Sequence, residues 1–182
     1  MRRVRYNAAI SLDGFIASPD GSTDWIVEDT SIDFDALYAQ FDIYIMGRKT
    51  YEVVTSHGDF NPLGSKAKEN VIVVSREMRQ EDYRNITILQ DGFIDTIRRL
   101  KSQDGKDIWF MGGGRLAAPL LEAGLVDTFE MAVMPAVLGK GIKMIAESDE
   151  TDKAGYSLDL TGLEKLDKSG IVILKYAVRY GK

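Results

Sequence analysis

The stretches at 43–50 and 108–117 read IYIMGRKT and IWFMGGGRLA, and together they decide the fold class. Each begins with four apolar residues, which is typical of a buried strand. Each then continues through glycine into a helical pattern, one from Gly47 to about Val54 and the other from the glycine triplet to about Ala123. We expect Pro119 to kink the second helix or to delay its start, because proline has no backbone N–H. A strand, a glycine turn and a helix therefore follow one another twice.

The first helix start carries cations where an empty helix end disfavours them. The first-turn N–H groups of a helix lack intrahelical partners, and the macrodipole makes that end positive. Arg48 and Lys49 nevertheless both lie in the first turn. A bound phosphate would make this arrangement favourable, with Gly47 allowing close approach and Thr50 donating a hydroxyl. The alternative is that both cationic side chains bend away into solvent.

The second helix start fits the pattern G-x-G-x-x-A, with Arg115 again a cation in the first turn. Between a strand and a helix, such glycines let the backbone approach a pyrophosphate. The alternative is a glycine-rich tight turn. In a standard NAD-type domain the pattern follows the first strand, and an acidic residue lies about 20 positions on. Here it comes late and Glu130 falls within an expected strand, so we do not expect a standard Rossmann domain.

The strand expected at 71–74 ends in Ser75-Arg76. A hydroxyl followed by a guanidinium suits a ribose 2′-phosphate, because the planar fork of arginine matches phosphate oxygens. This pair favours NADPH over NADH. The alternative is an arginine that leaves the strand into solvent.

The remaining segments extend this pattern in both directions. Strands alternate with helices until about residue 127 and dominate afterwards, which indicates a mostly parallel mixed sheet with an antiparallel C-terminal edge. We therefore predict a single α/β domain over 1–182. The other expected strands are 2–10, 86–88, 128–134, 155–166 and 171–180, with a short apolar stretch at 15–17, a turn at 167–170, helices at 33–40 and 93–102, and irregular chain at 55–69.

Composition excludes several functional classes. The chain has 182 residues, no cysteine and a net charge of −5, which excludes thiol chemistry and argues against nucleic-acid binding. Carboxylates alone make a poor metal site, and we expect the one histidine, His57, to be a solvated loop residue. No apolar run approaches the length of a membrane span, and no P-loop motif occurs. We expect a cytoplasmic protein with a small-molecule substrate, no nucleic acid and no membrane partner.

These motifs together resemble the dihydrofolate reductase superfamily. The stretch at 8–17 resembles its first strand and mobile loop, 46–52 its first cofactor helix, 71–76 its 2′-phosphate strand and 111–116 its glycine motif. The stretches at 112–127 and 135–141 are more similar to the reductase domain of the bifunctional riboflavin-pathway deaminase–reductase and its stand-alone relatives. The resemblance implies a three-layer sandwich with helices on both faces, a cis peptide within the glycine triplet and a homodimer.

The resemblance also implies NADPH as cofactor and a set of contacts to it. Carried over to this chain, they are Ala9, Ile16, Gly47, Arg48, Lys49, Thr50, Ser75, Arg76, Gly112, Gly113, Gly114, Arg115 and Leu116.

The sequence says less about the substrate contacts than about the cofactor contacts. Folate reductases carry a carboxylic acid on the first helix, and the matching position here is near Ser31, which is not an acid. Asp33 or Asp35 could replace it, although each could simply be a charge favoured by the helix dipole. Asp13 and Trp25 are candidate substrate contacts, with a turn role for the aspartate and a packing role for the tryptophan as alternatives.

Three functions therefore stay open. The leading expectation is an activity like that of 5-amino-6-(5-phosphoribosylamino)uracil reductase, in which the sugar of an aminopyrimidine is reduced. The second is reduction of dihydrofolate or another pterin. The third is a non-catalytic NADPH-binding protein on the same fold.

Overall fold

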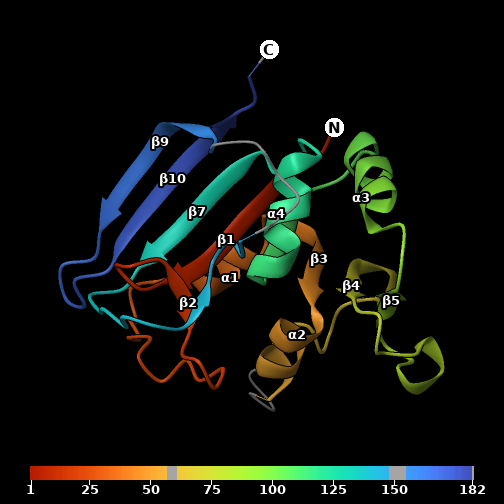
Figure 1. Ribbon diagram of the computed structural model, residues 1–182, viewed down its shortest axis with the longest axis horizontal. Coiled ribbons are helices and arrows are strands. Elements are labelled where there is room, and N and C mark those ends of the chain that lie inside the picture. Colours follow the sequence, from red (N-terminus) through yellow and green to blue (C-terminus); the bar gives the residue numbers. More distant parts are fainter. Residues whose placement is uncertain (57–60, 148–154, 182) are drawn as a thin grey trace.

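The computed structural model describes residues 1–56, 61–147 and 155–181, and its core is a sheet of eight strands in the order β5-β4-β3-β6-β1-β7-β10-β9 (Figure 1). Neighbouring strands are parallel from β5 to β7, and β10 is antiparallel to both β7 and β9. A two-stranded sheet joins β2 to β8. The strands are β1 (Val4–Ile10), β2 (Phe15–Ala17), β3 (Phe41–Gly47), β4 (Val71–Val74), β5 (Thr87–Leu89), β6 (Asp107–Gly112), β7 (Thr128–Val133), β8 (Ile142–Lys143), β9 (Ser157–Lys165) and β10 (Val172–Arg179).

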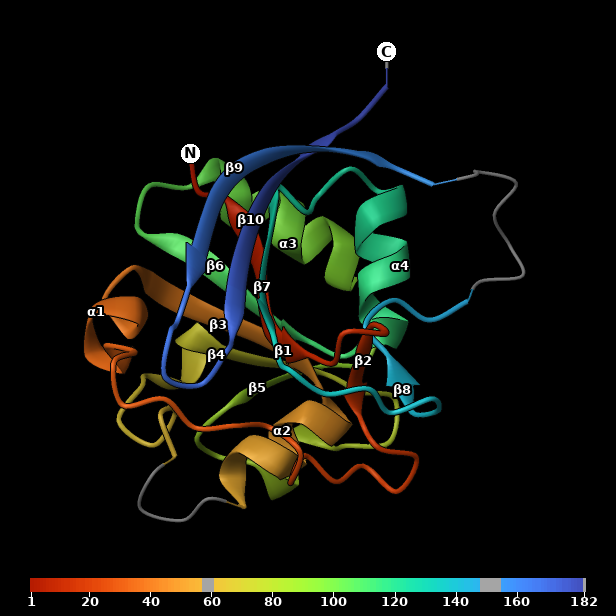
Figure 2. The same ribbon diagram turned by 90° about the vertical axis from the view of Figure 1, so that its left-hand side faces the viewer.

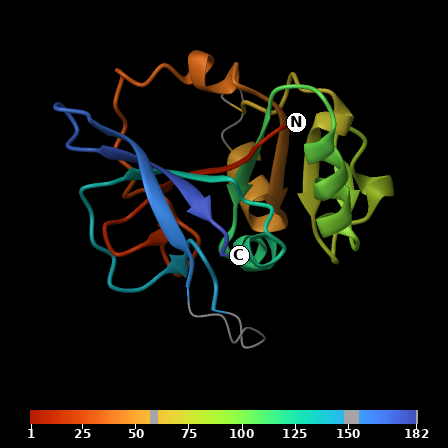
Figure 3. The ribbon, with the colours of Figure 1, turned by 90° about the horizontal axis from the view of Figure 1, so that it is seen from above.

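Alternation along the central strands produces two apolar faces, because successive side chains of a strand point to opposite sides. In β3, Ile43 and Ile45 belong to one core cluster, whereas Tyr44 and Met46 belong to another. Helices α3 (Phe93–Ser102) and α4 (Gly114–Glu122) pack on the first face, and α1 (Phe34–Tyr38) and α2 (Arg48–Thr55) pack on the second. Figures 2 and 3 show α1 and α4 on opposite sides of the strands, so the predicted three-layer sandwich is confirmed.

Most predicted elements are confirmed, and the differences have local causes. The first helix begins at Phe34 because Asp33 is its N-cap and accepts the N–H of Ala36 at 2.9 Å, and it ends at Tyr38, shortly before β3 begins at Phe41. A delayed start of the fourth helix is wrong: α4 begins at Gly114 and contains Pro119, which removes only one intrahelical hydrogen bond. Strand β8 was not predicted, and a short 3-10 turn at Lys68–Asn70 begins within the segment 55–69, which was expected to be irregular. His57 lies outside the described residues.

Glu130 lies in β7, as expected, and its role there is structural. Its carboxylate receives two hydrogen bonds of 2.6 Å from the Arg5 guanidinium, and both side chains are buried. A buried bidentate pair of this kind satisfies both charges within the protein. The residue is therefore not available to bind a ribose, in agreement with the argument against a standard Rossmann domain. No helix among the described residues is long and apolar enough to cross a membrane.

Candidate functional site

The two glycine turns meet because β3 and β6 are neighbouring parallel strands. Met46 is the register partner of Gly112, so both strands end at the same edge of the sheet and both helices start there. A Cβ placed on Gly47 would lie 3.8 Å from the backbone nitrogen of Gly113 and 3.6 Å from Cδ1 of Leu116. Two helix N-termini, each predicted from its own stretch of sequence, therefore face one small volume.

Both helix starts leave their backbone donors open to an anion. The N-cap residues are Gly47 for α2 and Gly113 for α4, and neither can donate or accept through a side chain. Neither first turn contains an acidic residue. The unpaired N–H groups and the positive ends of the two dipoles therefore combine into a site suited to a diphosphate.

Two further predicted contacts lie against this volume. A Cβ on Gly113 would be 3.6 Å from the Thr50 hydroxyl oxygen and 3.7 Å from Cδ1 of Ile16. Thr50 therefore presents a hydroxyl to the glycine turn, and Ile16 brings β2 beside it. The cis peptide expected in the triplet is present between Gly112 and Gly113, and Gly112 has a φ of 105°. A substituent on these glycines would enter the space between the helix ends, so the residues present fit a bound dinucleotide.

Gly114 is glycine for a different reason. A Cβ at this position would lie 2.2 Å from the carbonyl oxygen of Lys143 and 3.0 Å from the backbone nitrogen of Ala146. The Ala146 N–H also donates to the Gly114 carbonyl at 3.1 Å. The segment after β8 therefore packs directly on the start of α4. The sequence assigned this glycine to the cofactor, whereas its contacts in the structure are to the protein.

The cationic residues of the first turns differ in their surroundings. Lys49 and Arg115 are exposed, but Arg48 does not extend into solvent alone. Its Nη1 lies 2.6 Å from Oε1 of Glu52, and its Nη2 lies 3.0 Å from Oε2 of Glu77. The hydrogen bond to Glu52 raises the pKa of Arg48 above its ordinary value. Two carboxylates therefore hold the arginine in the first turn of α2.

The segment after β4 is fixed by a serine turn. Ser75 is buried, and its hydroxyl oxygen accepts the N–H groups of Glu77 and Met78, both at 3.2 Å. Arg76 is exposed and forms no ion pair with the described residues. The ion pair between Glu77 and Arg48 places this turn beside the start of α2. The structure thus brings the expected 2′-phosphate residues to the helix ends.

Asp13 holds two loops together. Its carboxylate accepts the Ser11 hydroxyl at 2.7 Å and the backbone N–H groups of Leu138 and Gly139 at 3.1 and 2.7 Å. The hydrogen bond from Ser11 is the main cause of the lowered pKa of Asp13. Both oxygens are engaged within the protein, so the observed role is the turn role that the sequence left open.

The acidic candidates for proton transfer lie on the surface of α1. Asp33 caps that helix and Asp35 lies in its first turn, and both are exposed. Sequence reasoning missed Asp29, which is a buried carboxylate in the loop before α1. Its Oδ1 accepts the N–H and the hydroxyl of Ser31 at 2.9 and 2.6 Å, whereas its Oδ2 is buried with no hydrogen-bond partner among the described residues. The nearby hydroxyls of Ser169 and Ser31 lower the pKa of Asp29 to about 2. It is therefore ionised near neutral pH, and it lies beside the turn that precedes β10. Its only local signal in the sequence was the triplet D-T-S at 29–31.

Trp25 and Ala9 pack in the same cluster, formed around Met134, Leu166 and Ile171. Ala9 is a predicted cofactor contact near the end of β1, and the tryptophan shares its cluster. Its indole N–H is buried and has no hydrogen-bond partner. A buried unpaired donor is rare. This observation keeps Trp25 as a candidate ligand contact.

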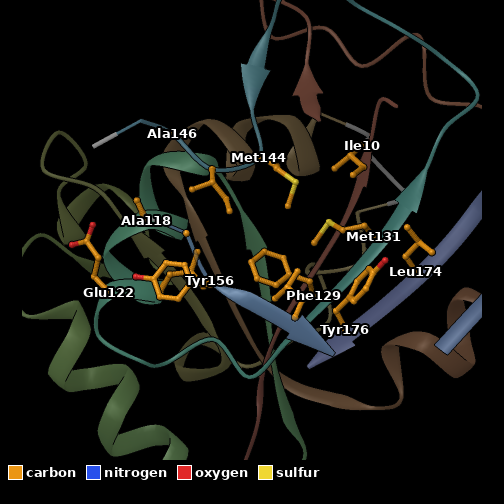
Figure 4. A pocket seen from close by; sticks show the side chains of 14 residues that line it. Ile10, Ala118, Glu122, Phe129, Met131, Met144, Ala146, Tyr156, Leu174 and Tyr176 are labelled. Carbon is orange, nitrogen blue, oxygen red and sulfur yellow. The ribbon is translucent and has the colours of Figure 1, made fainter. Parts of the chain in front are cut away.

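A second hollow lies between α4 and the β7–β10–β9 part of the sheet (Figure 4). Its volume is about 450 Å³, and its walls are mainly apolar side chains such as Phe129, Met131 and Leu174. Residues of the two glycine turns do not line it. This hollow, called the sheet-face pocket below, is therefore separate from the candidate cofactor site.

Comparison with known proteins agrees with this geometry. The profile of the RibD C-terminal domain matches residues 2–172. YyaP of Bacillus subtilis is 32% identical over 148 residues, covering 77% of this chain and 78% of its own. A Shewanella sp. PV-4 structure described as a riboflavin biosynthesis protein superposes with a TM-score of 0.78 at 26% identity, covering 99% of this chain and 100% of its own. The Thermotoga maritima diaminohydroxyphosphoribosylaminopyrimidine deaminase/5-amino-6-(5-phosphoribosylamino)uracil reductase shares the fold, with a TM-score of 0.64 at 15% identity, covering 98% of this chain and 57% of its own.

Proposed function

Because the chain belongs to the RibD C-terminal domain family, we propose that it is a cytoplasmic NADPH-dependent reductase resembling 5-amino-6-(5-phosphoribosylamino)uracil reductase. The observation that carries this proposal is the pair of glycine-capped helix N-termini that face one volume at the ends of β3 and β6. That arrangement suits the diphosphate of a dinucleotide. NADPH, when bound, supplies the hydride.

Different residues of the chain are proposed to bind each part of the cofactor and the substrate. The N-termini of α2 and α4 hold the diphosphate, and Arg48, Ser75 and Arg76 receive the 2′-phosphate. Ala9 and Ile16 lie beside the nicotinamide. The substrate occupies the space between the 17–25 loop and α1. Asp29, ionised by its hydroxyl neighbours, donates no proton near neutral pH.

The substrate class follows from what the first helix lacks. Folate reductases carry a carboxylic acid on the first helix, whereas the matching position here, near Ser31, is not an acid. The buried Asp29 lies two residues earlier, but it is ionised near neutral pH and has no proton to donate. This favours an aminopyrimidine that carries a ribose phosphate over dihydrofolate. A non-catalytic protein on this fold would bind NADPH at the same site but would turn over no substrate.

One experiment separates these functions. Purified protein is titrated with NADPH while energy transfer from tryptophan to the reduced nicotinamide is followed. Loss of NADPH absorbance is then measured with each candidate substrate. Absence of binding at tens of micromolar would refute the cofactor assignment. Binding without turnover of the pyrimidine or the pterin would favour the non-catalytic alternative.

Replacing Arg76 with alanine is expected to weaken NADPH binding by about tenfold to a hundredfold and to leave NADH binding unchanged. The reason is that only NADPH carries the 2′-phosphate, and a hydrogen bond to a charged group contributes about 1.5–3 kcal/mol. The dissociation constants of both nucleotides are measured by the same titration. Arg99→Ala, an exposed change in the last turn of α3, is the matched control. Equal losses for the two nucleotides would contradict the 2′-phosphate assignment.

We also propose that the protein is a homodimer, on the evidence of the edge strand β9. Leu158, Leu160 and Leu163 are 41%, 55% and 67% exposed. Their register partners in β10 are Val178, Tyr176 and Leu174. Leu160 and Leu163 are three residues apart, and in a regular strand this odd spacing would place them on opposite faces. A register shift between Lys175 and Tyr176 of β10 keeps Leu163 on the same face as Leu158 and Leu160.

A second copy of the chain suits this face better than a charged partner does. These three leucines and their partners Val178, Tyr176 and Leu174 form an apolar strip. Its six side chains carry no charge, so two copies that meet here bring no like charges of the strip into contact. The strip continues into the sheet-face pocket, which Leu158, Leu174 and Tyr176 also line (Figure 4). A contiguous exposed apolar face of this kind marks an interaction site, and a self-complementary one closes about a twofold axis.

The double change Leu160→Asp with Leu163→Asp is expected to convert the dimer to a monomer, because it places two carboxylates opposite their own copies. Mass is measured by light scattering after gel filtration, without nucleotide. Val137→Asp is the control, since this residue is 68% exposed but lies outside the strip. A wild-type protein that is monomeric at all accessible concentrations would refute the homodimer and leave the cofactor proposal intact.

A further inference from the structure

Arg48 links the start of α2 to the segment after β4 through a carboxylate that no cofactor motif requires. Its guanidinium contacts Glu52, four residues on in the same helix, and Glu77, which follows Ser75-Arg76. The contact to Glu52 is an ordinary helix pair. The contact to Glu77 is different, because it comes from another element and reaches into the region where the 2′-phosphate is proposed to bind.

The turn after β4 directs Glu77 toward the arginine. The Ser75 hydroxyl oxygen accepts the backbone N–H of Glu77 at 3.2 Å, which fixes the chain direction where the glutamate begins. The side chain of Glu77 is 74% exposed, whereas that of Arg48 is only 29% exposed. The arginine is therefore the positioned partner, and the glutamate is free to rotate into solvent.

The carboxylate of Glu77 and the 2′-phosphate of NADPH would compete for Arg48. Both are anions that bind a guanidinium, so a phosphate oxygen and Oε2 of Glu77 would compete for Nη2 of Arg48. A phosphate beside a retained Glu77 would also meet like-charge repulsion, which is strongest at low ionic strength. NADH, whose ribose carries a hydroxyl at this position, has no such conflict.

We propose that Glu77 is a specificity-determining residue that occupies Arg48 in the empty site and lowers the preference of the protein for NADPH over NADH. This inference rests on the proposed cofactor site. Binding of the 2′-phosphate requires Glu77 to leave Arg48 and turn into solvent. Glu52 keeps its contact to the other guanidinium nitrogen and holds the arginine in place. The glutamate therefore weakens NADPH binding selectively, in opposition to Arg76.

The test is Glu77→Gln, with dissociation constants for NADPH and NADH measured by fluorescence titration at low and high salt. Removing the competing charge is expected to tighten NADPH binding by about threefold to tenfold, a change of roughly 0.7–1.4 kcal/mol, and to leave NADH within about twofold. The gain for NADPH is expected to shrink as salt screens the exposed carboxylate. Glu77→Asp keeps the charge and is expected to stay closer to the wild type.

Glu81→Gln is the matched control, because this exposed glutamate lies in the same region, in the 3-10 turn Gln80–Asp82, and forms no ion pair with Arg48. Unchanged or weaker NADPH binding by Glu77→Gln would overturn the inference, as would an equal gain for NADH. A wild-type protein that binds neither nucleotide would overturn the proposed function itself. The two failures are thus distinguished by the wild-type titration alone, and a thermal melt confirms that each variant is folded.

Discussion

Gly114→Ala is expected to destabilise the protein by about 2–3 kcal/mol, because the added methyl has no room. Its Cβ would lie 2.2 Å from the Lys143 carbonyl oxygen, which is far inside van der Waals contact. The opposing atoms are backbone atoms of residues 143–146, and they cannot move aside as the end of a flexible side chain can. The start of α4 and the segment after β8 must therefore separate.

For a chain of this length, the loss corresponds to a fall in melting temperature of roughly 4–12 °C. The melting temperature is measured without nucleotide, so that ligand stabilisation does not contribute. Gly64→Ala is the control, since its Cβ would lie 3.5 Å from the Asn61 carbonyl oxygen, an ordinary contact distance. A Gly114→Ala protein that melts like the wild type would show that the segment accommodates the methyl, and the packing explanation would be wrong.

Gly47→Ala is expected to have the opposite outcome: a stable protein that loses NADPH. Its Cβ would meet Cδ1 of Leu116 at 3.6 Å and the Gly113 nitrogen at 3.8 Å, both ordinary contact distances. The methyl would nevertheless stand between the two helix N-termini, where the diphosphate must approach the backbone. We expect the affinity for NADPH to fall about 100-fold, or about 2.7 kcal/mol.

NADH shares the diphosphate, so its affinity is expected to fall by the same factor. This equality separates Gly47→Ala from Arg76→Ala, which discriminates between the nucleotides. Both dissociation constants are measured by fluorescence titration, and a thermal melt without nucleotide shows whether the fold is kept. Retained affinity for both nucleotides in a folded Gly47→Ala protein would place the diphosphate elsewhere and remove the observation on which the proposed function rests.

Strongly patterned elements were predictable from the sequence. The strand at 71–74 and the helix at 93–102 have the predicted bounds, because an apolar run between polar segments and a helical apolar stripe are local signals. Strand β8 has two residues and exists through its pairing with β2, so no local pattern could reveal it. The N-cap hydrogen bond of Asp33 fixes the start of α1, and the helix ends at Tyr38 because the chain enters β3 at Phe41.

The residues of the candidate site likewise include some that the sequence predicted and some that it missed. The sequence identified the glycine turns, Thr50 and Ser75-Arg76, because a strand, a glycine and a basic first turn are contiguous in the chain. It did not identify Asp29, since burial and the approach of Ser169 depend on a hairpin 140 residues away. The sequence assigned Gly112, Gly113 and Gly114 alike to cofactor contact. In the structure, Gly114 is constrained instead by the carbonyl oxygen of Lys143, which leaves no room for a Cβ.

The sequence by itself therefore determined the sheet type, the two helix starts and the family, since each depends on residues that are neighbours in the chain. Only the tertiary structure decided that the two helix starts face one volume, that Glu77 holds Arg48, and that the three leucines of β9 share one face. The physical reason is that these contacts join segments far apart in the chain. Their distances and registers are set by strand order, which no single segment encodes.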